Sequence, residues 1–244
     1  MTAPELSLVV PAHNEAARLP GTVDAIIAFF AERLAPAELV LVDDGSTDTT
    51  AEIITATAAR LPAHVVLRAP RHRVNRGKGA AVRTGCLAAT GDFVLYADAD
   101  LAVPLEEADR LLNALRAGCD VAIGSRVQAD GSDMRASQPL MRRMSGRGFT
   151  LLRRWLAVGD IVDTQCPMKG FRREAAQRLF RRQKLPGWAF DAEILFLARQ
   201  ANMRICEMPV RWRHVPGSKL RPGPTLALRS LSDLVRLRLV HLRD

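Results

Sequence analysis

The sequence predicts an α/β fold with three layers, in which helices cover both faces of a mainly parallel, mixed central sheet. Short apolar, β-branched runs alternate with longer helical patterns through the first half of the chain, and polar, glycine-containing turns follow several of these runs. With 244 residues, 48% hydrophobic and 25% charged, the chain is large enough for a substantial core, which excludes a mainly disordered protein.

The first half supplies the regular alternation. Strands are expected at residues 6–10, 38–42, 63–68, 92–97 and 120–124, and helices at about 18–34, 49–60, 79–89 and 104–117. Parallel sheets of this kind bind ligands at the carboxyl ends of their strands, so functional residues are sought there first.

The rhythm changes after Arg126. A polar loop at 127–139 precedes an arginine-rich helix at about 140–158, a strand at 164–171, helices at 174–180 and 190–200, a strand at 204–210, and a Pro/Gly loop at 216–224. No internal repeat or clean linker divides the chain. We therefore expect one domain over residues 1–224, followed by a basic amphipathic C-terminal helix over 225–244.

Charge is distributed unevenly. Residues 1–120 carry 11 Lys and Arg against 16 Asp and Glu, a net charge of −5, whereas residues 121–244 carry 24 against 10, a net of +14, which together give +9. The basic second half predicts contact with an anion, whether nucleic acid, anionic lipid or a phosphorylated substrate.

Hydropathy and cysteine spacing indicate in which cellular compartment the protein is expected. No apolar run approaches the roughly 18 residues of a membrane span, and no signal peptide is recognisable, so the protein is expected to be neither integral nor secreted. The four cysteines lie far apart without a C-x-x-C pair, which predicts reduced cytosolic thiols in preference to a metal site or a disulfide framework.

Polar clusters follow the first two expected strands. The segment Pro11-Ala-His-Asn-Glu15 is compatible with a plain strand-to-helix turn capped by Asn14. After the second strand, a turn explains Gly45 and Ser46, but it does not require the adjacent carboxylates Asp43 and Asp44, which repel each other unless a cation or polar ligand is present.

Two further clusters point to phosphate and metal. Asp98-Ala-Asp100 places two carboxylates on one side of a strand end, a pattern that suits Mg²⁺ or Mn²⁺, with solvated loop acids as the alternative. Asn75-Arg-Gly-Lys-Gly79 opens a helix with the glycines and cations of a phosphate cradle, and Arg126 follows the fifth strand with a guanidinium suited to phosphate oxygens.

In order, these motifs resemble the GT-A type nucleotide-sugar-binding domain of family 2 inverting glycosyltransferases. The further segments Asp163-Thr-Gln-Cys166, Gly187-Trp-Ala-Phe-Asp191-Ala-Glu193 and Glu207-Met-Pro-Val210 are similar to the dolichyl-phosphate β-glucosyltransferase and polyprenyl-phosphate glycosyltransferase branch. The resemblance covers about residues 6–242. It implies a nucleotide-sugar-binding half at 1–126 and an acceptor half at 127–224.

The resemblance also implies roles for individual residues. The nucleotide pocket would be lined by Pro11, His13 and Glu15, by Val42 and Asp44 beside the base, by Lys78, and by Asp98 and Ala99. Asp98 and Asp100 would hold Mg²⁺ or Mn²⁺ with the donor diphosphate, and the catalytic set would be Asp100, Arg126, Arg142 and Asp191.

The expected reaction transfers a hexose from a nucleotide sugar to a polyprenyl or dolichyl phosphate. UDP-glucose is the favoured donor, and GDP-mannose remains open. Because a phosphate acceptor is already ionised, its oxygen needs no base, and catalysis rests on aligning two anions and stabilising the diphosphate leaving group. Asp191 is the candidate base or sugar contact; an equal alternative is that it caps or orients the helix at 190–200.

A lipid acceptor implies a peripheral enzyme at the cytoplasmic face of the membrane, with an integral-membrane partner as a further possibility. The basic C-terminal helix and the arginines at 140–158 would face anionic headgroups, although packing of that helix on the domain is the simpler alternative.

A family 2 transferase with a soluble or glycan acceptor is the second interpretation. A nucleic-acid-binding protein is disfavoured because Asp43, Asp44, Asp98 and Asp100 stand where cations would be needed.

The sequence departs from the branch at one motif. Pro167-Met168 stands where the branch usually has Gly-Phe after Asp-Thr-Gln-Cys, which weakens any transfer of sugar or acceptor identity. Cys166 is expected to be a packed small residue and not a nucleophile, and Trp155, Trp188 and Phe190 are either core residues or stacking surfaces for a sugar or prenyl chain.

Overall fold

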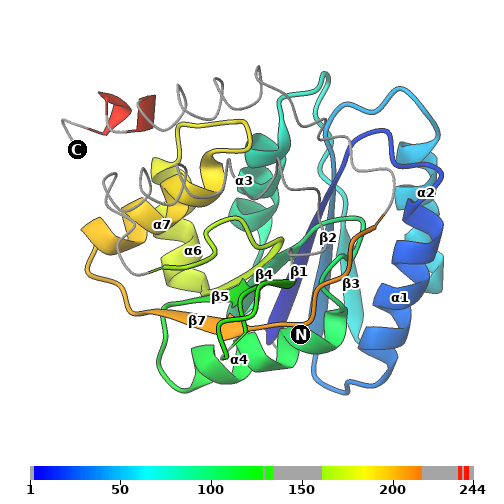
Figure 1. Ribbon diagram of the computed structural model, residues 1–244. Helices are drawn as coiled ribbons and strands as arrows, with labels where there is room; N and C mark the ends of the chain where they lie inside the picture. Colours follow the sequence, from blue (N-terminus) through cyan, green and yellow to red (C-terminus); the bar gives the residue numbers. More distant parts are fainter. Residues whose placement is uncertain (1–2, 129, 135–160, 216–235, 238, 242–244) are drawn as a thin grey trace.

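The computed structural model describes residues 3–128, 130–134, 161–215, 236–237 and 239–241. In this part of the chain a seven-stranded sheet has the order β3-β2-β1-β4-β6-β5-β7, as Figure 1 shows. The strands are β1 (Leu6–Ala12), β2 (Ala37–Asp43), β3 (Val65–Arg68), β4 (Phe93–Ala97), β5 (Val121–Ser125), β6 (Met168–Arg172) and β7 (Ile205–Pro209).

Helices connect most of these strands. They are α1 (Leu19–Ala31), α2 (Thr50–Thr57), α3 (Lys78–Ala88), α4 (Ala108–Arg116), α6 (Arg173–Arg182) and α7 (Phe190–Gln200), with short 3₁₀ turns η1 (Ala58–Arg60) and η2 (Leu105–Glu107). The expected alternation in the first half of the chain is confirmed, and each boundary lies within a few residues of the predicted one.

The sheet is mixed because one strand runs against its neighbours. Strands β1 to β4 pair in parallel, and β5 pairs with β7 in parallel, but β6 lies antiparallel between β4 and β5. From β1 the chain moves outward to β2 and β3 and then returns to the other side of β1 as β4. Such a reversal of strand order opens a crevice at the carboxyl ends of the strands.

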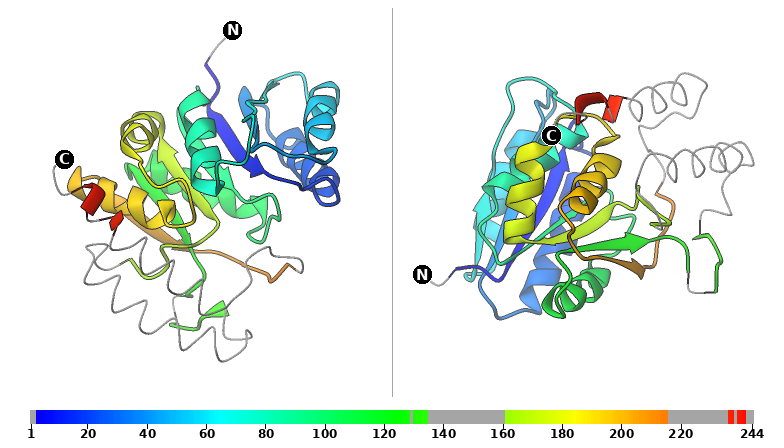
Figure 2. Two further views of the ribbon diagram at one scale, coloured as in Figure 1. Left: turned by 90° about the horizontal axis from the view of Figure 1, so that it is seen from above. Right: turned by 90° about the vertical axis from the view of Figure 1, so that its left-hand side faces the viewer.

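Alternating side chains of the strands feed two separate cores. Leu8 and Val10 of β1 face α1, α2 and α4, whereas Val9 faces α3, α6 and α7; all three are fully buried. Figure 2 shows the two helical layers on opposite faces of the sheet. The three-layer fold predicted from the sequence is therefore confirmed.

The second half of the chain is described in part. The expected strand at 164–171 is shorter and later, as β6, because residues 161–167 form turns before Met168. The expected helix at about 140–158 lies outside the described residues, as does most of the helix expected at 225–243.

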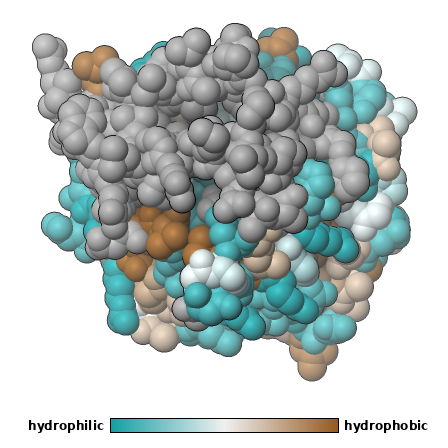
Figure 3. Space-filling model, viewed as in Figure 1, coloured by the Kyte–Doolittle hydropathy of each residue, from teal (hydrophilic) through white to brown (hydrophobic). Residues whose placement is uncertain are grey.

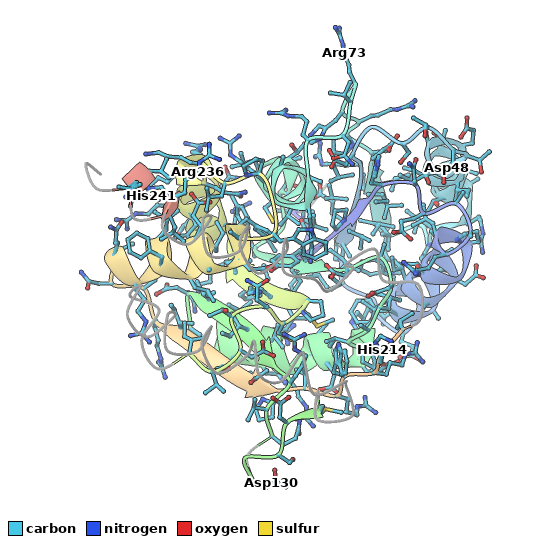
Figure 4. All side chains as sticks on the ribbon, turned by 45° about the horizontal axis from the view of Figure 1, so that its top comes forward. Asp48, Arg73, Asp130, His214, Arg236 and His241 are labelled. Carbon is cyan, nitrogen blue, oxygen red and sulfur yellow. A yellow bond between two sulfur atoms is a disulfide. The ribbon has the colours of Figure 1, made fainter. Side chains whose placement is uncertain are left out.

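The described C-terminal residues pack on the domain. Leu237 is buried in the core beside α7, and His241 Nε2 lies 2.7 Å from Glu193 Oε1 of α7. Arg236 and Leu239 are exposed, and Figure 4 shows Arg236 and His241 near one another at this end of the molecule. This part of the C-terminal segment thus has one face on the domain.

The prediction of four reduced thiols is wrong for two of them. Cys119, just before β5, forms a disulfide with Cys206 of β7, 87 residues away, with the two Cα atoms 6.1 Å apart. Pairing of β5 with β7 brings these cysteines together, a proximity that sequence spacing cannot show. Cys86 and Cys166 are free and buried, as a packed role for Cys166 requires.

Helix length and surface hydropathy show how the described part of the chain could meet a membrane. Within the described ranges, no helix is both long and apolar enough to cross a bilayer. The described part of the face in Figure 3 is largely hydrophilic, with hydrophobic side chains in a few small groups.

Candidate active site

A cavity of about 300 Å³ lies at the carboxyl ends of the adjacent strands β2, β1 and β4. It is lined by Pro11, Ala12, His13, Glu15, Arg18, Asp44, Asn75, Gly77, Lys78, Ala81, Asp98, Ala99, Asp100 and Trp188. Strand ends, the first turn of α3 and the segment before α7 therefore meet at one crevice, as the strand order predicts.

Asp43 and Asp44 have separate structural partners. Asp43 accepts the backbone N–H of Ser46 at 2.8 Å and pairs with Arg71 at 2.9 Å, so it holds the turn at Gly45. Gly45 has φ +71°, and a Cβ there would lie 2.3 Å from the carbonyl carbon of Val74, so glycine is required where the two loops cross.

Asp44 ties β2 to the start of α3. Its Oδ1 accepts hydrogen bonds from His72 Nδ1 at 2.6 Å and from the backbone N–H of Arg76 at 2.9 Å, and its Oδ2 accepts that of Gly77 at 2.9 Å. The other ring nitrogen of His72, Nε2, lies 2.8 Å from Thr84 Oγ1. Asp44 lines the cavity, as expected, but a nucleotide base would share oxygens that already bind the protein.

Lys78 and Asp98 form an ion pair in the cavity. Lys78 Nζ lies 2.7 Å from Asp98 Oδ1 and donates a hydrogen bond to Oδ2 at 2.9 Å. Burial alone would lower the pKa of Lys78, but Asp98, Asp191 and Asp100 together raise it. Burial raises the pKa of Asp98, with Asp100 and Asp191 adding to the effect and Lys78 opposing it. The cavity therefore concentrates negative charge that favours bound cations.

The two carboxylates fit a divalent cation. Asp98 Oδ1 is buried, and Lys78 Nζ lies 2.7 Å from it, so a divalent cation there would share this oxygen with the lysine. Asp100 Oδ1 accepts the N–H of Ala102 at 3.0 Å, which fixes the carboxylate. The described residues hold no cluster of three or more acidic, His or Cys side chains suited to a metal. Two carboxylates with substrate phosphates and water are a typical Mg²⁺ environment.

Hydrogen bonds join the first two sequence motifs. The backbone N–H groups of Asn14 and Glu15 donate to Ser46 Oγ at 3.0 Å and to Thr50 Oγ1 at 2.9 Å. Glu15 also pairs with Arg18 at 2.8 Å. The hydroxyls of Ser46 and of Thr50 in α2 thus hold the cavity-lining turn of the first motif.

Of the predicted residues that the structure describes, Val42, Arg126 and Asp191 do not line the cavity. Val42 is fully buried, and its side chain packs in the core with Val9 and α3. Its expected place beside a base therefore stays a prediction that only its backbone could meet. Arg126 forms a bidentate pair with Asp163, with two contacts of 2.7 Å, so those donors are not directed at a phosphate. Arg142 lies outside the described residues.

Asp191, the third of these described residues, is buried. Its side chain is 3% exposed, and its Oδ1 accepts hydrogen bonds from Tyr96 Oη and from Lys169 Nζ. A role as base stays a prediction, and these contacts favour the alternative in which Asp191 orients its surroundings.

Sequence reasoning missed several cavity residues. Arg18 and Ala81 line it but had no assigned role, whereas Asn75 and Gly77 line it as members of the motif predicted to be a phosphate cradle. Trp188 was left between core and stacking roles; it is 44% exposed at the cavity, and Lys78 Nζ lies 4.7 Å from its ring centre. Arg18 could have been identified from the sequence because it stands three residues after Glu15 of the first motif.

Comparison with known proteins finds a matching family model and similar relatives. The family model Glycosyl transferase family 2 matches residues 7–180. A dolichyl-phosphate beta-glucosyltransferase of Dictyostelium discoideum is 36% identical over 246 residues, covering 97% of this chain and 75% of the relative. Its human counterpart is 36% identical over 249 residues, covering 98% and 76%.

Solved structures show the same fold. Glucosyl-3-phosphoglycerate synthase from Mycobacterium tuberculosis, in complex with Mn²⁺, UDP and glucosyl-3-phosphoglycerate, has a TM-score of 0.67 at 19% identity, covering 96% of this chain and 80% of that one. A complex with Mg²⁺ and UDP has the same TM-score at 20% identity, covering 96% and 79%.

Fold and site define a GT-A-like protein with a crevice at the carboxyl ends of its strands. The match over residues 7–180 and the relatives at 36% identity place it more closely: the chain belongs to glycosyl transferase family 2. It is a glycosyltransferase, as the motifs predicted.

Proposed function

We propose that this protein transfers glucose from UDP-glucose to the phosphate of a polyprenyl or dolichyl phosphate, with inversion at the anomeric carbon. The observation that carries the proposal is the Asp98-Ala-Asp100 pair beside Lys78 in the cavity, in a chain similar over 97% of its length to a dolichyl-phosphate beta-glucosyltransferase. The Mycobacterium tuberculosis neighbours, whose titles include UDP with Mn²⁺ or Mg²⁺, support the donor and metal assignments.

Different residues of the cavity are proposed to contact different parts of the donor. Of the residues that line the cavity, we assign Asp44, His13 and Glu15 to the nucleoside and Asp98, Asp100 and Lys78 to the diphosphate. Mg²⁺ or Mn²⁺ held by Asp98 and Asp100 would neutralise charge on the diphosphate leaving group. Lys78 contributes a fixed cation at the same place, and Trp188 offers a ring face to the sugar.

The acceptor phosphate attacks as an anion. Its oxygen forms the new bond to the anomeric carbon while the bond from that carbon to the donor diphosphate breaks, and no proton has to leave the nucleophile. This chemistry agrees with an Asp191 that is buried and engaged by Lys169 and Tyr96. Residues 127–224 form the proposed acceptor half, with Arg142 near the acceptor phosphate.

We further propose that the enzyme works at the surface of a membrane as a peripheral protein. The loop between β3 and α3 supports this placement: Arg73, Val74 and Arg76 are exposed on it, and Asn75 and Gly77 of the same loop line the cavity. Figure 4 shows Arg73 extending away from the body of the protein. An exposed apolar side chain between cations suits an anionic lipid surface.

The deciding experiment offers the purified protein a panel of labelled nucleotide sugars. With Mg²⁺ or Mn²⁺ and polyprenyl phosphate, label from UDP-glucose is expected in the organic phase. Asp100→Ala is expected to lower the rate by about 10²-fold or more, the loss typical of a removed electrostatic contact to the transition state. Asp24→Ala, an exposed carboxylate of α1, is the matched control and should leave the rate unchanged.

Other outcomes separate the alternatives. If label enters the organic phase from GDP-mannose and not from UDP-glucose, the transferred sugar is mannose and the proposed glucose is wrong. A labelled water-soluble product from 3-phosphoglycerate, with none from polyprenyl phosphate, would overturn the lipid acceptor in favour of a soluble one, as in the synthase that shares the fold. Transfer should be faster in vesicles containing anionic phospholipid than in neutral vesicles, and equal rates would contradict the membrane contact.

A further inference from the structure

A fully buried lysine lies behind the cavity. Lys169 of β6 is 0% exposed, and its Nζ donates to Tyr96 Oη at 2.9 Å, to the Cys166 carbonyl at 2.9 Å and to Asp191 Oδ1. An ammonium has three N–H donors, and three acceptors surround this one. Tyr96 Oη also donates to Asp191 Oδ1, which closes a three-membered network.

The network connects the elements that carry the cavity. Lys169 lies directly opposite Tyr96 in the antiparallel pairing of β4 and β6, and Tyr96 stands two residues before Asp98. Asp191 belongs to the first turn of α7, three residues after Trp188 of the cavity wall. The network therefore fixes the end of β4 against α7 at the point where the carboxylate motif begins.

Its charges act on the cavity as well. Asp191 follows Phe190, whose ring centre lies 5.9 Å from Lys78 Nζ, so the first turn of α7 brings the Asp191 carboxylate near that ion pair. With Asp98 and Asp100 it makes three neighbouring anions, and within the cavity lining Lys78 is the cation that pairs with Asp98. Without a counter-charge of its own, Asp191 would compete with Asp98 for Lys78.

We infer that Lys169 is a positioning residue of the donor site, which neutralises Asp191 and thereby keeps Lys78 on Asp98 and the Asp98-Ala-Asp100 segment in place for a nucleoside diphosphate. In this arrangement Asp191 is the buried anion of the pair and not the base of the reaction. The assignment of the ligand rests on the proposed function; the role of Lys169 rests on the network itself.

Three variants test the inference: Lys169→Met, Asp191→Asn and the double variant. Each single change leaves one buried charge without its partner, which disturbs Lys78 and Asp98. The double change removes both charges, and the asparagine Oδ1 can still accept from Tyr96. The affinity for UDP with Mn²⁺, measured by titration calorimetry, is expected to fall at least about tenfold in each single variant and to recover to within about threefold in the double variant, a coupling within the range for contacting residues.

Steady-state kinetics provide the second readout. The single variants should raise the donor KM more than they lower kcat, and the double variant should recover both. If Asp191 is instead the base, kcat will fall alike in Asp191→Asn and in the double variant while UDP affinity stays unchanged, and that pattern overturns the inference. Should Lys169→Met fail to fold, the comparison of Asp191→Asn with the double variant still decides.

A matched control separates positioning from general stability. Glu38 of β2 is equally buried and ion-paired, with Arg68, but it lies at the amino end of its strand, away from the cavity. Glu38→Gln should lower stability without changing UDP affinity, and an equal loss of affinity there would refute a specific role for Lys169. UDP binding needs no acceptor, so a wild type that binds UDP but glycosylates no polyprenyl phosphate overturns only the proposed acceptor.

Discussion

Three carboxylates in or beside the cavity each have dedicated partners. Asp44 is held by His72 and two backbone N–H groups, Asp98 by Lys78, and Asp191 by Lys169 and Tyr96. A buried charge is stable only when it is paired and hydrogen-bonded. The polar residues around the cavity therefore form small groups of paired charges. Replacing one member of such a group leaves the charge of its partner buried and unpaired.

The cysteines allow a test at the scale of single residues. Burial raises the pKa of the Cys166 thiol to about 12, with Asp163 adding to the shift, and burial raises that of Cys86 well above its ordinary value. Neither thiol should react with a maleimide in the native protein. After unfolding without reductant two thiols should react, and with reductant all four, because Cys119 and Cys206 are linked. Four reactive thiols without reductant would contradict the disulfide.

At the scale of elements, helix α3 packs unusually close to the sheet. A Cβ added at Gly85 would lie 2.3 Å from Val9 Cγ1 and 2.9 Å from Val42 Cγ2. The absence of a side chain at Gly85 thus sets the distance between α3 and strands β1 and β2. The same helix begins at Lys78, so this distance also places Lys78 beside Asp98.

Substitution of Gly85 by alanine should therefore cost stability. The overlap with two stiff valines is expected to lower the free energy of unfolding by about 1–3 kcal/mol. Gly21→Ala in α1 is the matched control, because a Cβ there meets nothing within 4 Å, and alanine should raise stability by up to about 1 kcal/mol. Urea unfolding measures both variants, and equal effects would show that α3 can move away from the sheet.

For the whole molecule, a buried carboxylate at the amino end of the sheet links stability to pH. Burial alone would raise the pKa of Glu38, but hydrogen bonds from Ser7, Arg68 and Thr90 outweigh it and lower the pKa below 4.5. A lowered folded-state pKa means that Glu38 stabilises the fold above about pH 4.5, and that this contribution disappears as the pH falls through the folded-state value.

Glu38→Gln should show this contribution directly. We expect a loss of about 1–3 kcal/mol in the free energy of unfolding at neutral pH, since charge-assisted hydrogen bonds are removed. The difference from wild type should shrink in acid, when Glu38 of the wild type is protonated as well. Urea unfolding at about pH 7 and about pH 3 measures it, and a difference independent of pH would refute the assignment.

Strand and helix positions were predictable because period and turn chemistry are local. The runs before Pro11, Asp43 and Asp98 are apolar and β-branched, and each ends in a polar turn, so the strand ends and their functional carboxylates could be located from the chain alone. Arg126 and Asp191 could not be assigned in the same way. Their partners Asp163 and Lys169 are 37 and 22 residues away in sequence.

The sequence by itself determined the layered α/β fold, the edge of the sheet that carries the site, and the family. These follow from periodicity and from ordered motifs, which are properties of neighbouring residues. Only the tertiary structure decided which carboxylates line the cavity, that Asp191 pairs with Lys169, and that Cys119 meets Cys206. Those outcomes depend on strand order and on the antiparallel insertion of β6, because packing brings together side chains that are distant in the sequence.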